Sequence, residues 1–93
     1  MSEVLVVERT VVIVNQAGIH ARPAAMLVQL ASKFTSEIHV GKDGLDVNAK
    51  SIMGVLLLAA ECGAQLKIRS EGPDAQEAVD AIAALVARGF EES

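Results

Sequence analysis

Residues 15–25 read Asn-Gln-Ala-Gly-Ile-His-Ala-Arg-Pro-Ala-Ala, and this segment joins an apolar run to an amphipathic one. Pro23 is tolerated in the first turn of a helix, where its missing N–H would have no partner. The sequence therefore predicts a helix start at Pro23, with His20 immediately before it. Gly18 supplies the backbone freedom that a sharp approach to the helix requires.

The residue types around His20 suggest a site that binds phosphate. The unpaired N–H groups at a helix start attract anions, and the helix dipole adds to the attraction. His20 is then a candidate nucleophile, with Arg22 and the amides of Ala21 and Arg22 holding phosphoryl oxygens. From residue types alone a simpler interpretation competes with this one, in which His20 is a helix cap or a surface residue.

Before the joint, β-branched residues predict a first strand over residues 6–14, with Val4 and Leu5 leading into it. After it, residues 21–33 carry apolar side chains at three- and four-residue steps, which predicts a helix. Its expected buried face consists of Ala24, Leu27, Val28, Leu30, Ala31 and Phe34. Ala25 and Gln29 fall on the more exposed side, beside the histidine.

The middle of the chain predicts a hairpin and a short helix. Alternation over residues 36–42 indicates a half-buried strand with His39 facing solvent, and the Asp-Gly pair that follows favours a tight turn into a strand over residues 45–47. Ser51 is a favoured N-cap for a helix over residues 52–60, which Gly63 can end.

The last third predicts a strand over residues 65–71 and a final helix. Asp74 is expected to cap that helix in a capping box with Glu77. Its expected buried face consists of Ala78, Val79, Ile82, Leu85 and Val86, and Arg88 with Gly89 should end it. The order β-α-β-β-α-β-α predicts one α+β domain over residues 1–93, an open-faced two-layer sandwich with a mostly antiparallel four-stranded sheet and helices on one face.

Composition excludes several function classes. The chain of 93 residues has a net charge of −4, no Trp or Tyr and two Phe, which argues against a nucleic-acid partner. No apolar stretch is long enough to span a membrane, and no secretion signal precedes the first strand. The single cysteine, Cys62, excludes an internal disulfide, and no metal-ligand spacing is present. A cytoplasmic protein without cofactor or metal is expected.

Two segments together resemble the HPr family of the bacterial phosphotransferase system. Residues 18–24 (Gly-Ile-His-Ala-Arg-Pro-Ala) are similar to the active-site signature of that family. Residues 47–54 (Val-Asn-Ala-Lys-Ser-Ile-Met-Gly) are similar to its regulatory-serine motif. The separation of the motifs and the chain length also fit, and the resemblance covers nearly the whole chain.

The resemblance implies a phosphoryl carrier rather than a stand-alone turnover enzyme. His20 would carry the phosphoryl group on Nδ1, with Arg22 as the oxyanion partner. Enzyme I, which uses phosphoenolpyruvate, would be the donor and enzyme II A domains the acceptors in sugar uptake. Ala25, Gln29, Ile52 and Met53 would belong to the docking surface of a monomeric carrier. From the residues alone, Ile52 and Met53 could equally be core.

Ser51 carries a second implication of the resemblance, in which an HPr kinase/phosphorylase modifies it and a transcription regulator binds the product. The simpler interpretation is that Ser51 only caps its helix. A nitrogen-type (NPr) regulatory module that serves no sugar transport is the alternative function, and the sequence does not separate it from the sugar-type branch. The presence of His20 favours carriage.

Overall fold

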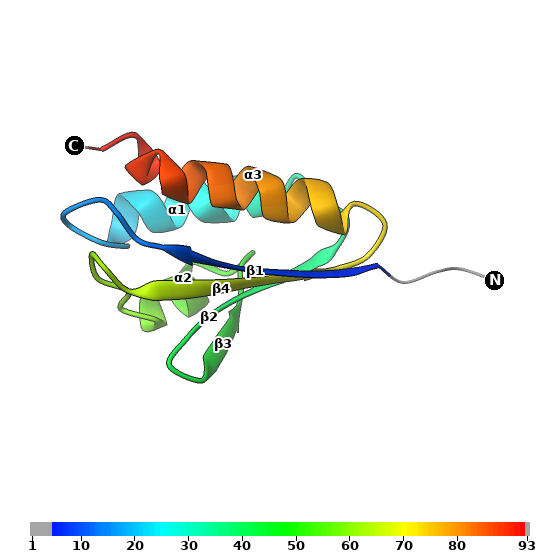
Figure 1. Ribbon diagram of the computed structural model, residues 1–93, viewed down its shortest axis with the longest axis horizontal. Coiled ribbons are helices and arrows are strands. Elements are labelled where there is room, and N and C mark those ends of the chain that lie inside the picture. The colour runs from blue at the N-terminus through cyan, green and yellow to red at the C-terminus, as the bar shows by residue number, and fades with distance from the viewer. Residues whose placement is uncertain (1–4, 93) are drawn as a thin grey trace.

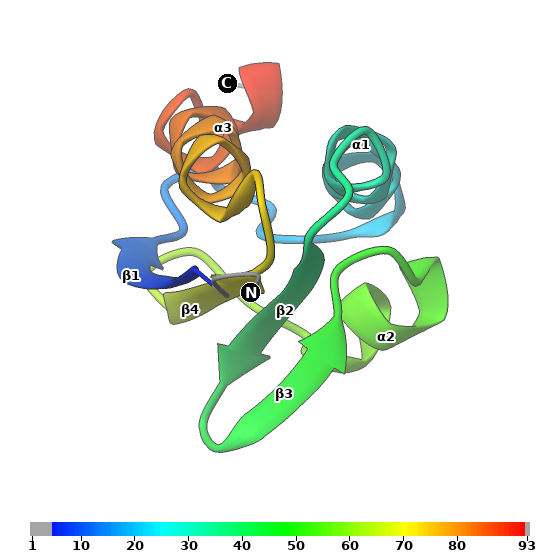
Figure 2. The same cartoon turned by 90° about the vertical axis from the view of Figure 1, so that its right-hand side faces the viewer.

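The computed structural model describes residues 5–92, in which four strands form one antiparallel sheet with the order β1-β4-β2-β3. The elements are β1 (Val6–Val12), α1 (Ala21–Ala31), β2 (Glu37–Lys42), β3 (Leu45–Asn48), α2 (Ile52–Leu57), β4 (Gln65–Glu71), α3 (Ala75–Ala87) and a 3-10 turn, η1 (Gly89–Glu91). The first and last strands lie side by side (Figure 1). The helices lie on one side of the twisted sheet, with α2 beside β3 (Figure 2). The predicted element order and two-layer α+β class are confirmed.

The core forms between the sheet and the two longer helices. Along β4, Leu66 and Ile68 are fully buried while Lys67 between them is exposed, as the two-residue period of a strand requires. The predicted buried face of α3 is confirmed at every position, and Phe90 beyond it is also fully buried.

The first strand is shorter than the sequence predicted. Pairing with β4 ends at Val12, which lies opposite Gln65. Ile13 instead donates its N–H to the Ala64 carbonyl (2.9 Å) and accepts from the Gly63 N–H (2.7 Å). The predicted strand end at residue 14 is therefore wrong, because the backbone turns to pair with a loop. Of the predicted leader, Val4 lies outside the described residues.

Helix α1 begins two residues earlier than predicted, with His20 as its N-cap and Pro23 as the third residue of its first turn. Pro23 still occupies a position where no intrahelical N–H bond is needed. The helix ends at Ala31, not at Lys33, because the Lys33 N–H bonds back to the Leu30 carbonyl over three residues (3.1 Å).

The hairpin and the start of α2 follow the prediction, but the end of α2 does not. Ser51 caps the helix by accepting the Gly54 N–H (3.1 Å). The helix stops at Leu57, and Ala59 has a φ of 49°. The Lys42 ammonium donates to the carbonyls of Leu58 (3.3 Å) and Ala59 (3.1 Å), so a lysine of β2 ends the helix and not Gly63.

Asp74 does not form the predicted capping box. Its carboxylate makes no side-chain cap and instead accepts the backbone N–H groups of Thr35 (2.9 Å) and Ser36 (2.8 Å) and the Ser36 hydroxyl. These bonds tie the loop before β2 to the start of α3. The Ser36 hydroxyl, followed by the Thr35 N–H, lowers the pKa of Asp74 to about 2.

The histidine loop is joined to the loop after α2 by a seam, which we define as the contacts of residues 13–19 with residues 60–64. Ile19 donates its N–H to the Ala60 carbonyl (2.8 Å), next to the two bonds of Ile13. Gly18 has a φ of 69° and lies so close that a Cβ atom there would be 2.5 Å from the Ala60 oxygen. Only glycine satisfies both conditions at this position.

The first testable prediction concerns acid stability. Because the folded-state pKa of Asp74 is about 2 against an ordinary 3.8, its contribution is complete above about pH 4 and is lost as the pH falls toward 2. Asp74→Asn is therefore expected to lower the melting temperature at pH 7, with the difference from the parent protein closing by pH 2. Glu77→Gln is the control and should melt like the parent. If it lowered the melting temperature as much as Asp74→Asn does, the capping box between Asp74 and Glu77 would be supported instead.

The second prediction concerns the seam. Gly18→Ala should lower the free energy of unfolding by about 1–3 kcal/mol more than Gly63→Ala, the range for overpacking. Both positions have positive φ, but nothing lies within 4 Å of a Cβ atom at Gly63. Urea unfolding of the two variants measures the difference, and equal losses would mean that the contact with Ala60 is easily relieved.

Candidate functional site

His20 stands at the start of α1 with an extended backbone (φ −97°, ψ −163°) and makes no side-chain cap. Its side chain is 46% exposed. The seam fixes the backbone that leads into this residue, because Gly18 and Ile19 are held against the loop after α2. The imidazole is therefore accessible while its backbone is held.

The first turn of α1 leaves amides without a helical partner beside the imidazole. The first helical bond runs from the Ala24 N–H to the His20 carbonyl (3.0 Å), so the N–H groups of Ala21 and Arg22 precede it. Both residues are exposed. These amides, the positive end of the helix dipole and the Arg22 guanidinium together form a place that attracts anions.

A carboxylate that the sequence analysis did not single out meets the imidazole. Glu92 places Oε2 at 2.9 Å and Oε1 at 3.2 Å from His20 Nε2. The Asn15 amide donates both to Glu92 Oε1 (3.0 Å) and to the Gly18 carbonyl (2.8 Å). Local spacing could not reveal this contact, because Glu92 is 72 residues away from His20 in the chain.

The same contacts keep the Glu92 side chain ionised. The hydrogen bond with His20, then that with Asn15 and the charges of His20 and Arg22, lower the pKa of Glu92 below its ordinary value, while partial burial acts in the opposite direction. Its side chain is 15% exposed. The site thus combines an ionised carboxylate, an imidazole and a helix start.

The residues predicted for docking lie on α1 and α2, which pack against each other. Gln29 is exposed and Ala25 half-buried, while Ile52 is 44% and Met53 72% exposed, so the alternative that Ile52 and Met53 are core is wrong. Leu57, which the sequence analysis did not single out, is 69% exposed on the same short helix. Exposed leucine, isoleucine and methionine side chains on one helix are typical of a contact surface.

Ser51 lies at the opposite end of this pair of helices from His20. The ammonium of Lys50, the preceding residue, bonds to the Phe34 carbonyl just beyond α1 (2.7 Å), whereas Gly18 and Ile19 contact Ala60 beyond the other end of α2. The eleven residues of α1 correspond to roughly 16 Å of helix. The two candidate sites are therefore separated by about the length of α1.

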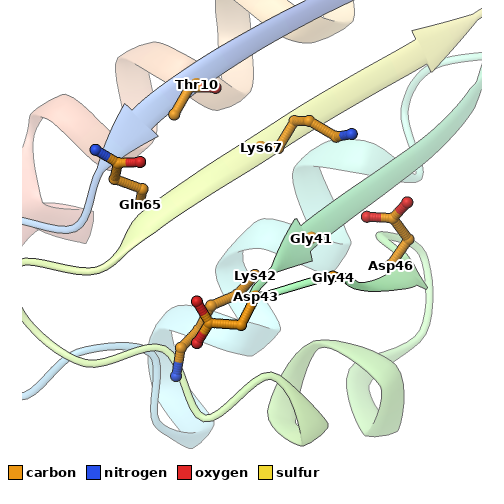
Figure 3. A pocket seen from close by; sticks show the side chains of 8 residues that line it. All are labelled: Thr10, Gly41, Lys42, Asp43, Gly44, Asp46, Gln65 and Lys67. Carbon is orange, nitrogen blue, oxygen red and sulfur yellow. The ribbon is translucent and has the colours of Figure 1, made fainter.

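A hollow of about 490 Å³ lies elsewhere, on the sheet face away from the helices. Figure 3 shows its lining from the strands and from the β2–β3 turn: Thr10, Gly41, Lys42, Asp43, Gly44, Asp46, Gln65 and Lys67. None of the predicted site residues lines it. Its lining mixes acidic and basic side chains and contains neither an imidazole nor a thiol.

Two features are absent from residues 5–92. No group of three or more His, Cys, Asp or Glu side chains is arranged there to hold a metal ion. Within the same range, no helix has the length and apolar character needed to cross a bilayer.

Comparison with known proteins points to one family. The family described as "PTS HPr component phosphorylation site" matches residues 7–88, so Glu92 lies beyond the matched range. The phosphocarrier protein HPr of Treponema pallidum is 52% identical over 86 residues, covering 92% of this chain and 98% of the relative. The HPr-like protein Crh of Bacillus subtilis is 45% identical over 80 residues, covering 86% and 94%.

A solved structure agrees with the sequence matches. The crystal structure of an HPr from Thermoanaerobacter tengcongensis is 49% identical, with a TM-score of 0.89, and the alignment covers 92% of this chain and 97% of that one. Both motifs lie inside the range of residues 7–88 that the family matches. The chain belongs to the HPr family, the phosphocarriers of the phosphotransferase system.

Proposed function

We propose that His20 carries a phosphoryl group on Nδ1, which it receives from enzyme I and passes to enzyme II A domains in sugar uptake. The observation that supports this most directly is the exposed imidazole at the start of α1, with Nε2 occupied by Glu92. Nδ1 is the ring nitrogen left for attack on phosphorus.

The surroundings of His20 suit a phosphoryl group better than a neutral ligand. The amides of Ala21 and Arg22 and the Arg22 guanidinium offer donors for equatorial oxygens, where charge develops during transfer. A relay also needs a nucleophile that two different partners can reach, and His20 is exposed. Arg22 acts in this proposal as the oxyanion partner.

Docking is assigned to the exposed surface of α1 and α2. Ala25 and Gln29 follow His20 on α1, while Ile52, Met53 and Leu57 supply apolar side chains on α2. Desolvation of such side chains can hold a partner while His20 stays at the edge of the contact. The carrier is expected to act as a monomer in the cytoplasm.

The transfer experiment is a direct test. The protein is incubated with phosphoenolpyruvate and a general enzyme I, and phosphate is followed by intact mass. His20→Ala should take up none. Arg22→Ala should be phosphorylated about 10²-fold more slowly and unfold within about 0.5 kcal/mol of the parent. An acid-labile phosphate in His20→Ala, or on His39, would overturn the assignment.

Regulation at Ser51 is the second part of the proposal. Its hydroxyl accepts the Gly54 N–H, and the ammonium of the preceding residue, Lys50, is anchored on the Phe34 carbonyl. Phosphate oxygens could replace the hydroxyl as acceptors, and a helix start favours their charge. An HPr kinase/phosphorylase would add the group, and a transcription regulator would bind the product. The phosphate would lie about the length of α1 away from His20. It would therefore act on docking and not on the transfer chemistry.

Two substitutions separate charge from capping at Ser51. Asp and Asn are both good N-caps, so Ser51→Asp and Ser51→Asn should melt no lower than the parent. Only Ser51→Asp should accept phosphate from enzyme I more slowly, because its charge adjoins Ile52 and Met53 in an apolar contact. Asp carries less charge than phosphate, so the measured effect is a lower limit. Equal transfer rates for both variants would leave Ser51 as a helix cap.

A further inference from the structure

The chain beyond α3 is shaped so that it returns to the histidine. Gly89, Phe90 and Glu91 have φ values of 65°, 53° and 60°, three consecutive residues in the left-handed region. A bulky side chain is rare in that region and carries a conformational cost. Phe90 is fully buried in the core, which offsets that cost and anchors the turn.

The turn delivers the carboxylate of Glu92 to Nε2 of His20, as described above, and Asn15 fixes the carboxylate from the other side. Asn15 is 3% exposed, and its amide spans Glu92 and the Gly18 carbonyl. The carboxylate is therefore held between a buried amide and the ring. Arg22 is the other charged side chain whose charge acts on it.

An ionised carboxylate can only accept hydrogen bonds, so the ring nitrogen that faces it must carry the proton. With the proton on Nε2, the lone pair of Nδ1 is free. Partners of this kind fix the tautomer and the orientation of imidazoles in other sites. The arrangement selects Nδ1 before any phosphoryl donor arrives.

The same proton matters during transfer. When the Nδ1 lone pair forms the bond to phosphorus, the bond from phosphorus to the donor breaks and its electron pair leaves with the donor. The ring then bears phosphate on Nδ1 and a proton on Nε2, and is cationic. When the P–N bond breaks toward an acceptor, its electron pair returns to Nδ1 and a neutral imidazole is regenerated. If Nε2 had lost its proton, imidazolate would have to leave, which is far less favourable.

We propose that Glu92 is a positioning residue for His20, which fixes the Nε2–H tautomer and retains that proton in the phosphorylated ring so that the phosphoryl group stays transferable. The proposal rests on His20 being the carrier. It assigns a role to a residue beyond both sequence motifs, held by a turn of unusual backbone conformation. No proton has to enter or leave the ring in a full cycle of loading and transfer.

The test compares Glu92→Gln with Glu91→Gln, a neighbour in the same turn whose carboxylate faces Arg88 and not His20. The imidazole nitrogens of ¹⁵N-labelled protein are observed by NMR before and after phosphorylation. The parent and Glu91→Gln should show a protonated Nε2 in both states. Glu92→Gln should show a mixture of tautomers before phosphorylation and a deprotonated Nε2 after it.

Transfer to an enzyme II A domain is measured on the same samples. Glu92→Gln should pass its phosphoryl group on about tenfold more slowly, the lower figure for partners that orient an imidazole, and Glu92→Asp should recover part of the rate. Unchanged ring spectra and an unchanged rate in Glu92→Gln, with His20 still phosphorylated, would overturn the role of Glu92 and leave the carrier function intact. A parent protein that takes no phosphate on His20 would overturn both.

Discussion

The seam between residues 13–19 and residues 60–64 is the constraint on which the site depends. Three backbone hydrogen bonds cross it, from Ile13, Gly63 and Ile19. Gly18 brings the two loops to a distance that a side chain would prevent. Because the seam joins the end of β1 to the chain after α2, the start of α1 is positioned by two parts of the protein that are distant in sequence. An exposed histidine can therefore stand on a fixed backbone.

The elements with a clear hydrophobic period were predictable from the sequence. Residues 65–69 alternate between polar and apolar side chains and lie in β4, which has the expected bounds, and the buried face of α3 follows its apolar positions. The tight turn at Asp43 and Gly44 and the cap at Ser51 also depend on local chemistry only. His20 and Arg22 came from local pattern and resemblance together, and the helix that follows His20 begins at Ala21, two residues before the predicted start at Pro23.

What could not be predicted depends on partners distant in sequence. Ile13 looked like a strand residue, and its side chain is buried as in one, but its backbone bonds to a loop. Asp74 has the residue type and spacing of a cap, yet stronger donors at Ser36 and Thr35 compete for it. Glu92 gave no signal, since only the left-handed turn after α3 brings it to His20. In each case a tertiary contact overrides a local preference.

Helix α2 has six residues, of which Val55 alone is fully buried, and it is held by Ser51 at one end and Lys42 at the other. Isolated helices of this length are unstable in water. Its amide protons should therefore exchange with solvent by local opening, at a free energy below that of global unfolding. The segment that carries Ile52, Met53 and Leu57 can then adjust its shape to successive partners without loosening the sheet beneath it.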